Sequence, residues 1–271
     1  MKGKNTVKKF IKARNAMSLA VSATIIVAVT VVLVLVASSY AYQTLERQRG
    51  SVEFNAAKKS ILTFDDAIRD VAWEIGEART ARFTVNYGHV ELIPNVLPIT
   101  IVVEDYPVSY DNYTSYVRYC LSTQYVTFGD GYEEYILGDE AVGTSQAAEN
   151  LGRAIIRQEG RWINITLFYR ALALRTFYVN VSLGAEPTMV NYVDIYVIKL
   201  IVLNHSTYVG DFDLKAKNIG ITTETFGPYT VIYNTCTIAV TIGNELSHIN
   251  IPLSNGKVVF NIHVAHVQIS T

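Results

Sequence analysis

Residues 17–42 read MSLAVSATIIVAVTVVLVLVASSYAY, and this run decides how the rest of the chain is organised. No charged side chain occurs between Arg14 and Glu46, and Val, Ala, Ile and Leu dominate the run. A helix needs about 20 predominantly apolar residues to cross the hydrocarbon core of a bilayer. The run exceeds that length, so it can cross with some tilt. The sequence therefore predicts a transmembrane helix over residues 17–42.

The residues before this run form a basic arm. Residues 1–16 contain lysine and arginine but no acidic side chain. Positive segments beside a membrane helix stay in the cytoplasm. We therefore predict a cytoplasmic leader over residues 1–16, and an extracellular location for everything after Tyr42. The whole chain has a formal net charge of −1 at pH 7, so its overall field does not favour nucleic acid as a partner.

The junction between the arm and the run, KARNAMSLA over residues 12–20, resembles the class III signal of archaeal type IV pilins and archaellins. In that family a prepilin peptidase cuts after a small residue that follows basic ones, and the apolar helix stays on the mature protein. The resemblance implies cleavage after Ala16, which makes Met17 the new N-terminus. Two features depart from the family: the arm is long, and Val21 stands at the fifth mature position, where bacterial pilins carry glutamate.

A second helical pattern follows the run. No proline occurs between Gln43 and Arg82, and apolar residues recur there at three- and four-residue steps: Ile61, Phe64, Ile68, Val71, Ala72 and Ile75. This spacing places an apolar stripe on one face of a helix. We expect an amphipathic stem helix over residues 43–82, with a bend at Gly50 and Ser51.

From Phe83 onward the pattern is that of β-structure. Short runs of Tyr, Val, Ile and Thr alternate with turn residues, which is typical of strands. Residues 190–203 are apolar on both faces, as expected for a central strand. The predicted fold class is α+β: a long N-terminal transmembrane and stem helix, then a mostly antiparallel, β-sandwich-like head over residues 83–271. The head is expected to be a sandwich or two abutting sheets, with a seam near residues 139–160.

The sequence contains no pattern that indicates a catalytic or metal site. Cys120 and Cys236 are far apart, and the alternatives of a disulfide outside the cell and of two buried free thiols stay open. The sequence lacks the Cys-x-x-Cys spacing that is typical of zinc sites, and none of the five histidines has a convincing catalytic or metal-binding partner. Asp130, Glu133 and Glu134 are a weak Ca²⁺ candidate, because the alternating ligands of an EF-hand are missing. We therefore expect no enzyme activity, no cofactor and no metal.

Four Asn-x-Ser/Thr sequons are candidates for N-glycosylation in an extracellular head: Asn112, Asn164, Asn180 and Asn204. Asn112 is the best of these from the sequence, because it stands in a polar segment that reads as a turn.

These observations favour a type IV pilin-like, structural or adhesive subunit of a surface filament. Residues 17–42 would pack with other copies of the chain, after a stage in the lipid bilayer and processing by a prepilin peptidase. The alternative is a single-pass membrane protein whose extracellular β domain serves binding or cell-envelope assembly.

Overall fold

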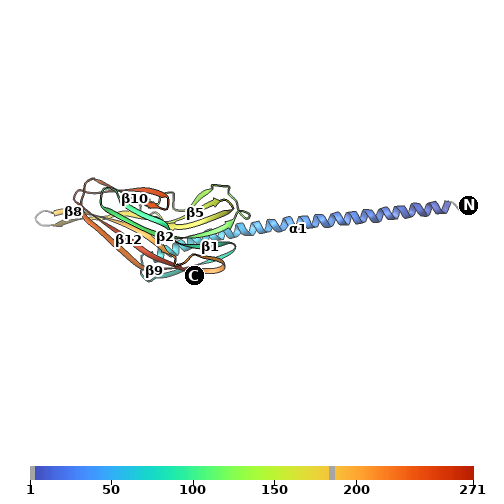
Figure 1. The fold of residues 1–271 in the computed structure, drawn as a ribbon, viewed down its shortest axis with the longest axis horizontal. Helices are drawn as coiled ribbons and strands as arrows, with labels where there is room; N and C mark the ends of the chain where they lie inside the picture. Colours follow the sequence, from blue (N-terminus) through green and yellow to red (C-terminus); the bar gives the residue numbers. More distant parts are fainter. Residues whose placement is uncertain (1–3, 183–186) are drawn as a thin grey trace. The chain divides into compact units, whose positions relative to one another are not determined.

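The computed structural model describes the backbone of residues 4–182 and 187–271, and the side chains of residues 21–176 and 189–271. Its only described helix is α1 (Lys4–Ala72). The strands follow it in the chain (Figure 1): β1 (Ala78–Val103), β2 (Val108–Ser122), β3 (Glu133–Leu137), β4 (Gly143–Thr144), β5 (Gly152–Glu159), β6 (Trp162–Tyr169), β7 (Ala171–Ser182), β8 (Pro187–Ile201), β9 (Ser206–Thr230), β10 (Thr235–Ile242), β11 (Glu245–Pro252) and β12 (Lys257–Ser270). The predicted α+β class, with a long N-terminal helix and a mostly antiparallel sheet, is confirmed.

The chain divides into two compact units, residues 1–49 and residues 50–271. In the first unit, every described side chain from Val21 to Leu45 is exposed. This part of α1 is long and apolar enough to cross a membrane, and its most apolar window buries nothing inside the protein. Apolar side chains exposed over this length are typical of a segment that a membrane or another protein covers.

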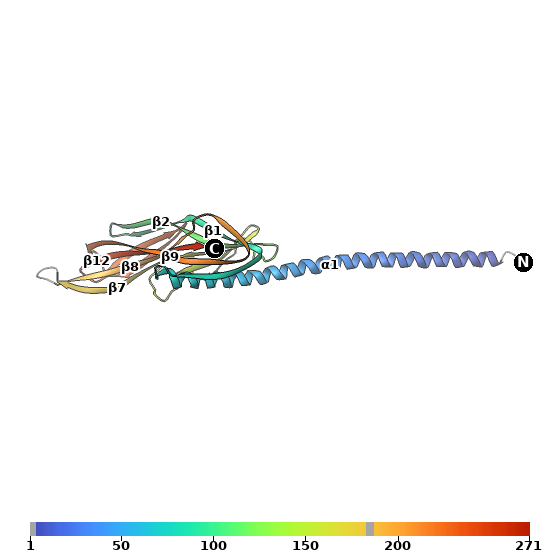
Figure 2. The ribbon, with the colours of Figure 1, turned by 90° about the horizontal axis from the view of Figure 1, so that it is seen from below.

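In the second unit, hereafter the head, α1 is part of the core. Phe54, Ile61, Phe64 and Ile68 are each no more than 2% exposed. The cyan end of α1 lies along the sheet beside β1 (Figure 2). The predicted apolar stripe is confirmed up to Ala72, whereas Ile75 lies beyond the helix and is exposed.

The stem helix ends earlier than residue 82. The carbonyl of Ala72 accepts a hydrogen bond from Asn218 Nδ2 at 2.6 Å, and the chain then turns at Gly76, whose φ is 87°. Positive φ is easy for glycine and rare for other residues, so the helix stops here. The residues from Ala78 onward have formed β1 instead.

α1 continues through Gly50 and Ser51, so the helix is not interrupted at the residues where a bend is expected. Gly50 is buried against a side chain of the head, and a Cβ on it would lie 2.5 Å from Cβ of Tyr125. Glycine at this position allows close packing against Tyr125.

All twelve described strands belong to one hydrogen-bonded sheet, in the order β3-β5-β6-β2-β1-β9-β12-β8-β7-β4. The hairpin of β10 and β11 attaches to β1 outside this order. The pairs β12–β8 and β4–β7 are parallel and the others are antiparallel. The predicted β-sandwich of two abutting sheets is not confirmed, and the expected seam at 139–160 contains β4 and β5, which join the same sheet.

Two hydrophobic cores lie on opposite faces of the central strands. Alternate residues of a strand point to opposite faces. In β8, Ile198 and Leu200 join the core that includes α1, whereas Val193, Ile195 and Val197 join the second core, which includes β10 and β11. The prediction that this stretch is a central strand covered on both sides is confirmed.

Gly152 is a sensitive point in the contact between α1 and the sheet. A Cβ on Gly152 would lie 2.0 Å from Oδ1 of Asp65. Asp65 is 1% exposed and accepts a 2.8 Å hydrogen bond from the hydroxyl of Tyr169, so it has little room to move. We expect Gly152→Ala to lower the free energy of unfolding by about 1–3 kcal/mol, as overpacking usually does. Urea unfolding measures this, and Gly220→Ala, where a Cβ meets no atom within 4 Å and φ is not positive, is the neutral control.

Candidate functional site

A polar patch covers the face of β1 and β2 that points away from α1. Val90 and Leu92 in β1 belong to the core that includes α1, so their neighbours His89 and Glu91 point to the other face. The same alternation in β2 places Arg118 and Cys120 on that face. The strand register pairs His89 with Cys120, and Glu91 with Arg118. Four side chains with hydrogen-bonding or metal-binding groups, two from each strand, therefore lie next to one another on this face.

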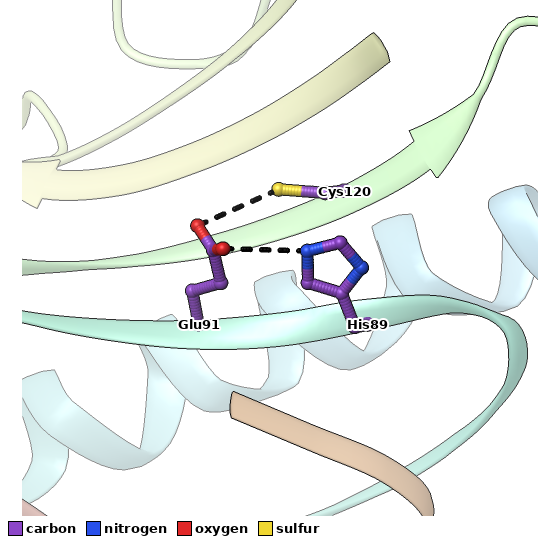
Figure 3. Close-up of side chains that lie close together, drawn as sticks. All are labelled: His89, Glu91 and Cys120. Carbon is purple, nitrogen blue, oxygen red and sulfur yellow. Dashed lines mark hydrogen bonds and ion pairs between the residues drawn. The ribbon is translucent and has the colours of Figure 1, made fainter. Parts of the chain in front are cut away.

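Glu91 is the centre of this patch (Figure 3). Its Oε2 accepts hydrogen bonds from Nε and Nη2 of Arg118, at 3.1 and 2.9 Å. Its Oε1 lies 3.3 Å from Nε2 of His89. The thiol of Cys120 donates to Oε2 at 3.8 Å. One carboxylate thus brings together an imidazole, a thiol and a guanidinium.

The electrostatics keep the carboxylate ionised and the thiol protonated. Burial raises the pKa of Cys120 to about 12, and the charge of Glu91 adds to this shift. Burial also acts to raise the pKa of Glu91, but the hydrogen bonds and charge of Arg118 outweigh it, and the net shift is downward. Without another cation, Cys120 is therefore not an activated nucleophile at neutral pH.

A cavity of about 330 Å³ opens over these residues. Its wall also includes Glu159, Trp162 and Asn164 from β5 and β6. The rings of His89 and Trp162 meet edge to face, with centroids 5.5 Å apart. The patch is therefore accessible to a small solute.

The residues of the expected Ca²⁺ site do not converge. Glu133 and Glu134 are consecutive in β3, so they point to opposite faces. Arg157 donates to Glu133 at 3.0 Å, and the hydroxyl of Tyr132 donates to Glu134 at 2.8 Å. Asp130 is exposed in the preceding turn. Within the described part of the chain, these three acids do not form a group able to hold a metal ion.

The candidate glycosylation sites differ in access. Asn164 is only 6% exposed and donates from Nδ2 to Glu159, so its amide nitrogen is not accessible in the folded head. Asn112 lies in β2 rather than in a turn, and its Oδ1 accepts a 2.7 Å hydrogen bond from Lys199. Asn204 is exposed between β8 and β9, which makes it the best candidate in the structure. The side chains of Asn180, Ala16 and Met17 lie outside the described residues.

Cys120 and Cys236 are both buried free thiols, so the candidate disulfide is not formed. Cys120 pairs with His89 across β1 and β2, whereas Cys236 in β10 pairs with Ile251 and belongs to the second core. The two side chains thus serve different parts of the head.

This arrangement predicts the outcome of a thiol titration. The full chain, denatured without reductant, is expected to give two reactive thiols, whereas both react slowly in the native protein. Burial accounts for the slow reaction, because it raises the pKa of Cys236 as well as that of Cys120 to about 12. Finding no free thiol after denaturation would show that Cys120 and Cys236 form a disulfide.

The sequence contains part of the signal for the polar patch. His89-Val-Glu91 and Arg118-Tyr-Cys120 each alternate polar and apolar residues, which places each pair on one face of its strand. Which strands are neighbours, and in which register, is not contained in that alternation. The sequence alone therefore does not predict the patch, and it indicates Cys120 only as a disulfide partner or a buried free thiol.

The patch is the most chemically specific feature of the head. Among the described residues, His89, Glu91 and Cys120 form the one group of three or more metal-ligating side chains whose donor atoms all lie within 4.8 Å of one another. An imidazole nitrogen, a carboxylate oxygen and a sulfur suit a transition metal better than Ca²⁺ or Mg²⁺. Comparisons with family models, with curated proteins and with solved structures found no match for this chain.

Proposed function

We propose that the chain is a type IV pilin-like subunit of an extracellular surface filament with a structural or adhesive role. The observation that carries the proposal is the difference in burial between the two parts of α1. Residues 21–45 leave every side chain exposed, whereas from Gly50 onward the same helix is built into the core of the head. An apolar surface of this extent is unstable in water and needs a cover.

In this proposal the cover changes during the life of the protein. Lipid covers residues 17–42 first, with the basic arm in the cytoplasm and the head outside the cell. After a prepilin peptidase cuts behind Ala16, the same segment of neighbouring copies replaces the lipid. The β-rich heads form the outer surface, with Asn204 available for a glycan.

The alternative is a single-pass protein that stays in the bilayer and presents its head for binding or for cell-envelope assembly. The patch around Glu91 favours this alternative to the extent that it recognises a ligand. The two proposals share the membrane segment and differ in the fate of residues 1–16.

The N-terminus of the native protein tests the proposal. Mass spectrometry of chains from the cell surface is expected to find Met17 as the first residue, in filaments visible by electron microscopy. Ala16→Phe is expected to block processing, because the resemblance requires a small residue before the cut, and Ala13→Phe is the matched control. Surface chains that all retain the basic arm would contradict the filament proposal and support the permanent anchor.

A further inference from the structure

We propose that His89, Glu91 and Cys120 form a binding site for one divalent ion of the zinc class. The three side chains come from adjacent strands and point to the same face of the sheet (Figure 3). Their donor atoms lie within 4.8 Å of one another, so one ion can touch all three after small side-chain movements. This site is independent of the filament proposal, since it requires only the folded head.

The distances are close to those of a tetrahedral site. Zinc binds nitrogen and oxygen at about 2.0–2.2 Å and sulfur at about 2.3 Å. In a tetrahedron these bonds separate the ligand atoms by roughly 3.3–3.7 Å. Nε2 of His89 lies 3.3 Å from Oε1 of Glu91, and Sγ of Cys120 lies 3.8 Å from Oε2. A small rotation of the carboxylate would present Oε1 to the ion together with the other two donors.

Neighbouring side chains already orient these ligands. Arg118 binds Oε2 of Glu91 and leaves Oε1, on the side of His89, for an ion. Trp162 contacts the ring of His89 edge to face. Outer partners of this kind commonly set the orientation of metal ligands. The charge of Arg118 opposes the binding of a cation. The two anionic ligands, carboxylate and thiolate, balance only part of the combined positive charge of a divalent ion and this guanidinium. We therefore expect moderate affinity.

The donor set selects the class of metal. Ca²⁺ and Mg²⁺ prefer oxygen ligands, whereas Zn²⁺ accepts nitrogen, oxygen and sulfur together. Cys120 would bind as a thiolate: the sulfur–metal bond forms as the S–H bond breaks, and the proton leaves to solvent. Three protein ligands leave the fourth position open towards the cavity beside Asn164 and Glu159, where water completes the tetrahedron.

Metal titration of the purified full chain in detergent tests the site. We expect one Zn²⁺ per chain, measured by competition with a chromophoric chelator. Co²⁺ in place of Zn²⁺ is expected to show a sulfur-to-cobalt charge-transfer band. Cys120→Ser should abolish that band, whereas Cys236→Ser, the other buried thiol, should retain it. His89→Gln and Glu91→Gln should each weaken Zn²⁺ binding more than about 100-fold, since loss of even an outer partner costs roughly 10–100-fold.

The controls separate a true site from misfolding and from surface binding. His248→Gln removes an exposed histidine that also faces a glutamate, Glu104, at 3.4 Å, and it should leave Zn²⁺ affinity unchanged. Circular dichroism shows whether each variant is folded. If Cys120→Ser does not fold, the Zn²⁺ affinity of His89→Gln tests the proposal. Absence of saturable binding, a charge-transfer band that survives in folded Cys120→Ser, or equal weakening by His248→Gln and His89→Gln would overturn the proposal.

Discussion

Replacing Glu53 by alanine is expected to lower the free energy of unfolding of the head by about 3 kcal/mol or more, because several buried donors lose their acceptor together. Glu53 lies on α1 and is only 7% exposed. Its carboxylate accepts hydrogen bonds from the backbone nitrogens of Asn86 at 2.6 Å, Tyr87 at 3.0 Å and Gly88 at 2.9 Å. The hydroxyl of Tyr119 donates to it as well, at 3.0 Å.

These contacts explain why one side chain has so large an effect. The register of β1 with its neighbour β9 shifts between Val85 and Val90, so the strand is irregular where these amides lie. Each buried amide left without a partner costs about 1–3 kcal/mol. Glu53 therefore satisfies the irregular part of β1 and attaches it to α1.

Urea unfolding of the full chain, followed by the fluorescence of Trp73 and Trp162, measures the change. Glu53→Gln is expected to lose less than Glu53→Ala, because its carbonyl oxygen still accepts some of the hydrogen bonds. Glu74→Gln, at an exposed glutamate just beyond α1, should be neutral. Equal unfolding midpoints for Glu53→Ala and Glu74→Gln would show that these hydrogen bonds contribute little.

Much of α1 and of the sheet could be predicted from the sequence because both depend on local periodicity. The charge-free run and the stripe from Ile61 to Ala72 predicted the long helix and its buried face. The end of that helix depends on Asn218, which donates a hydrogen bond to Ala72 from far along the chain, so the sequence pattern predicts an end that lies too far along the chain. Local pattern alone does not contain a contact between such distant residues.

The same distinction explains the prediction of the sites. The burial of Asn164 and the place of Asn112 in β2 depend on strand pairing, and the sequence shows only that both belong to sequons. Likewise, the alternation of His89 and Glu91 is visible, but their meeting with Cys120 requires the register of β1 and β2. A shift by one residue would send Cys120 to the face of α1.

Leu33→Arg tests the role of the exposed apolar segment most directly. Leu33 is 62% exposed near the middle of residues 17–42. An arginine at the centre of a membrane helix costs about 3 kcal/mol in insertion, which corresponds to a factor of more than 100. We expect the variant to leave the membrane fraction during an alkaline wash. Leu203→Arg, the same change at a 72% exposed leucine of the head, is the control and should remain with the membrane.

Replacing each residue from 31 to 36 in turn by serine, a milder change than arginine that leaves the chain in the membrane, distinguishes the two covers. All six side chains are exposed to a similar degree, between 52% and 65%, so the isolated helix does not favour any direction. Lipid surrounds a single helix, and the cost of a polar serine then changes smoothly with depth and hardly depends on the face that carries it. Neighbouring helices in a filament contact particular faces, and tolerance should then recur with the helical period of 3.6 residues. Membrane retention without a helical period across the six positions, together with filament yield that is periodic, is the result expected for a subunit that exchanges lipid for its own copies. Absence of a helical period in both assays would identify lipid as the final neighbour of this segment.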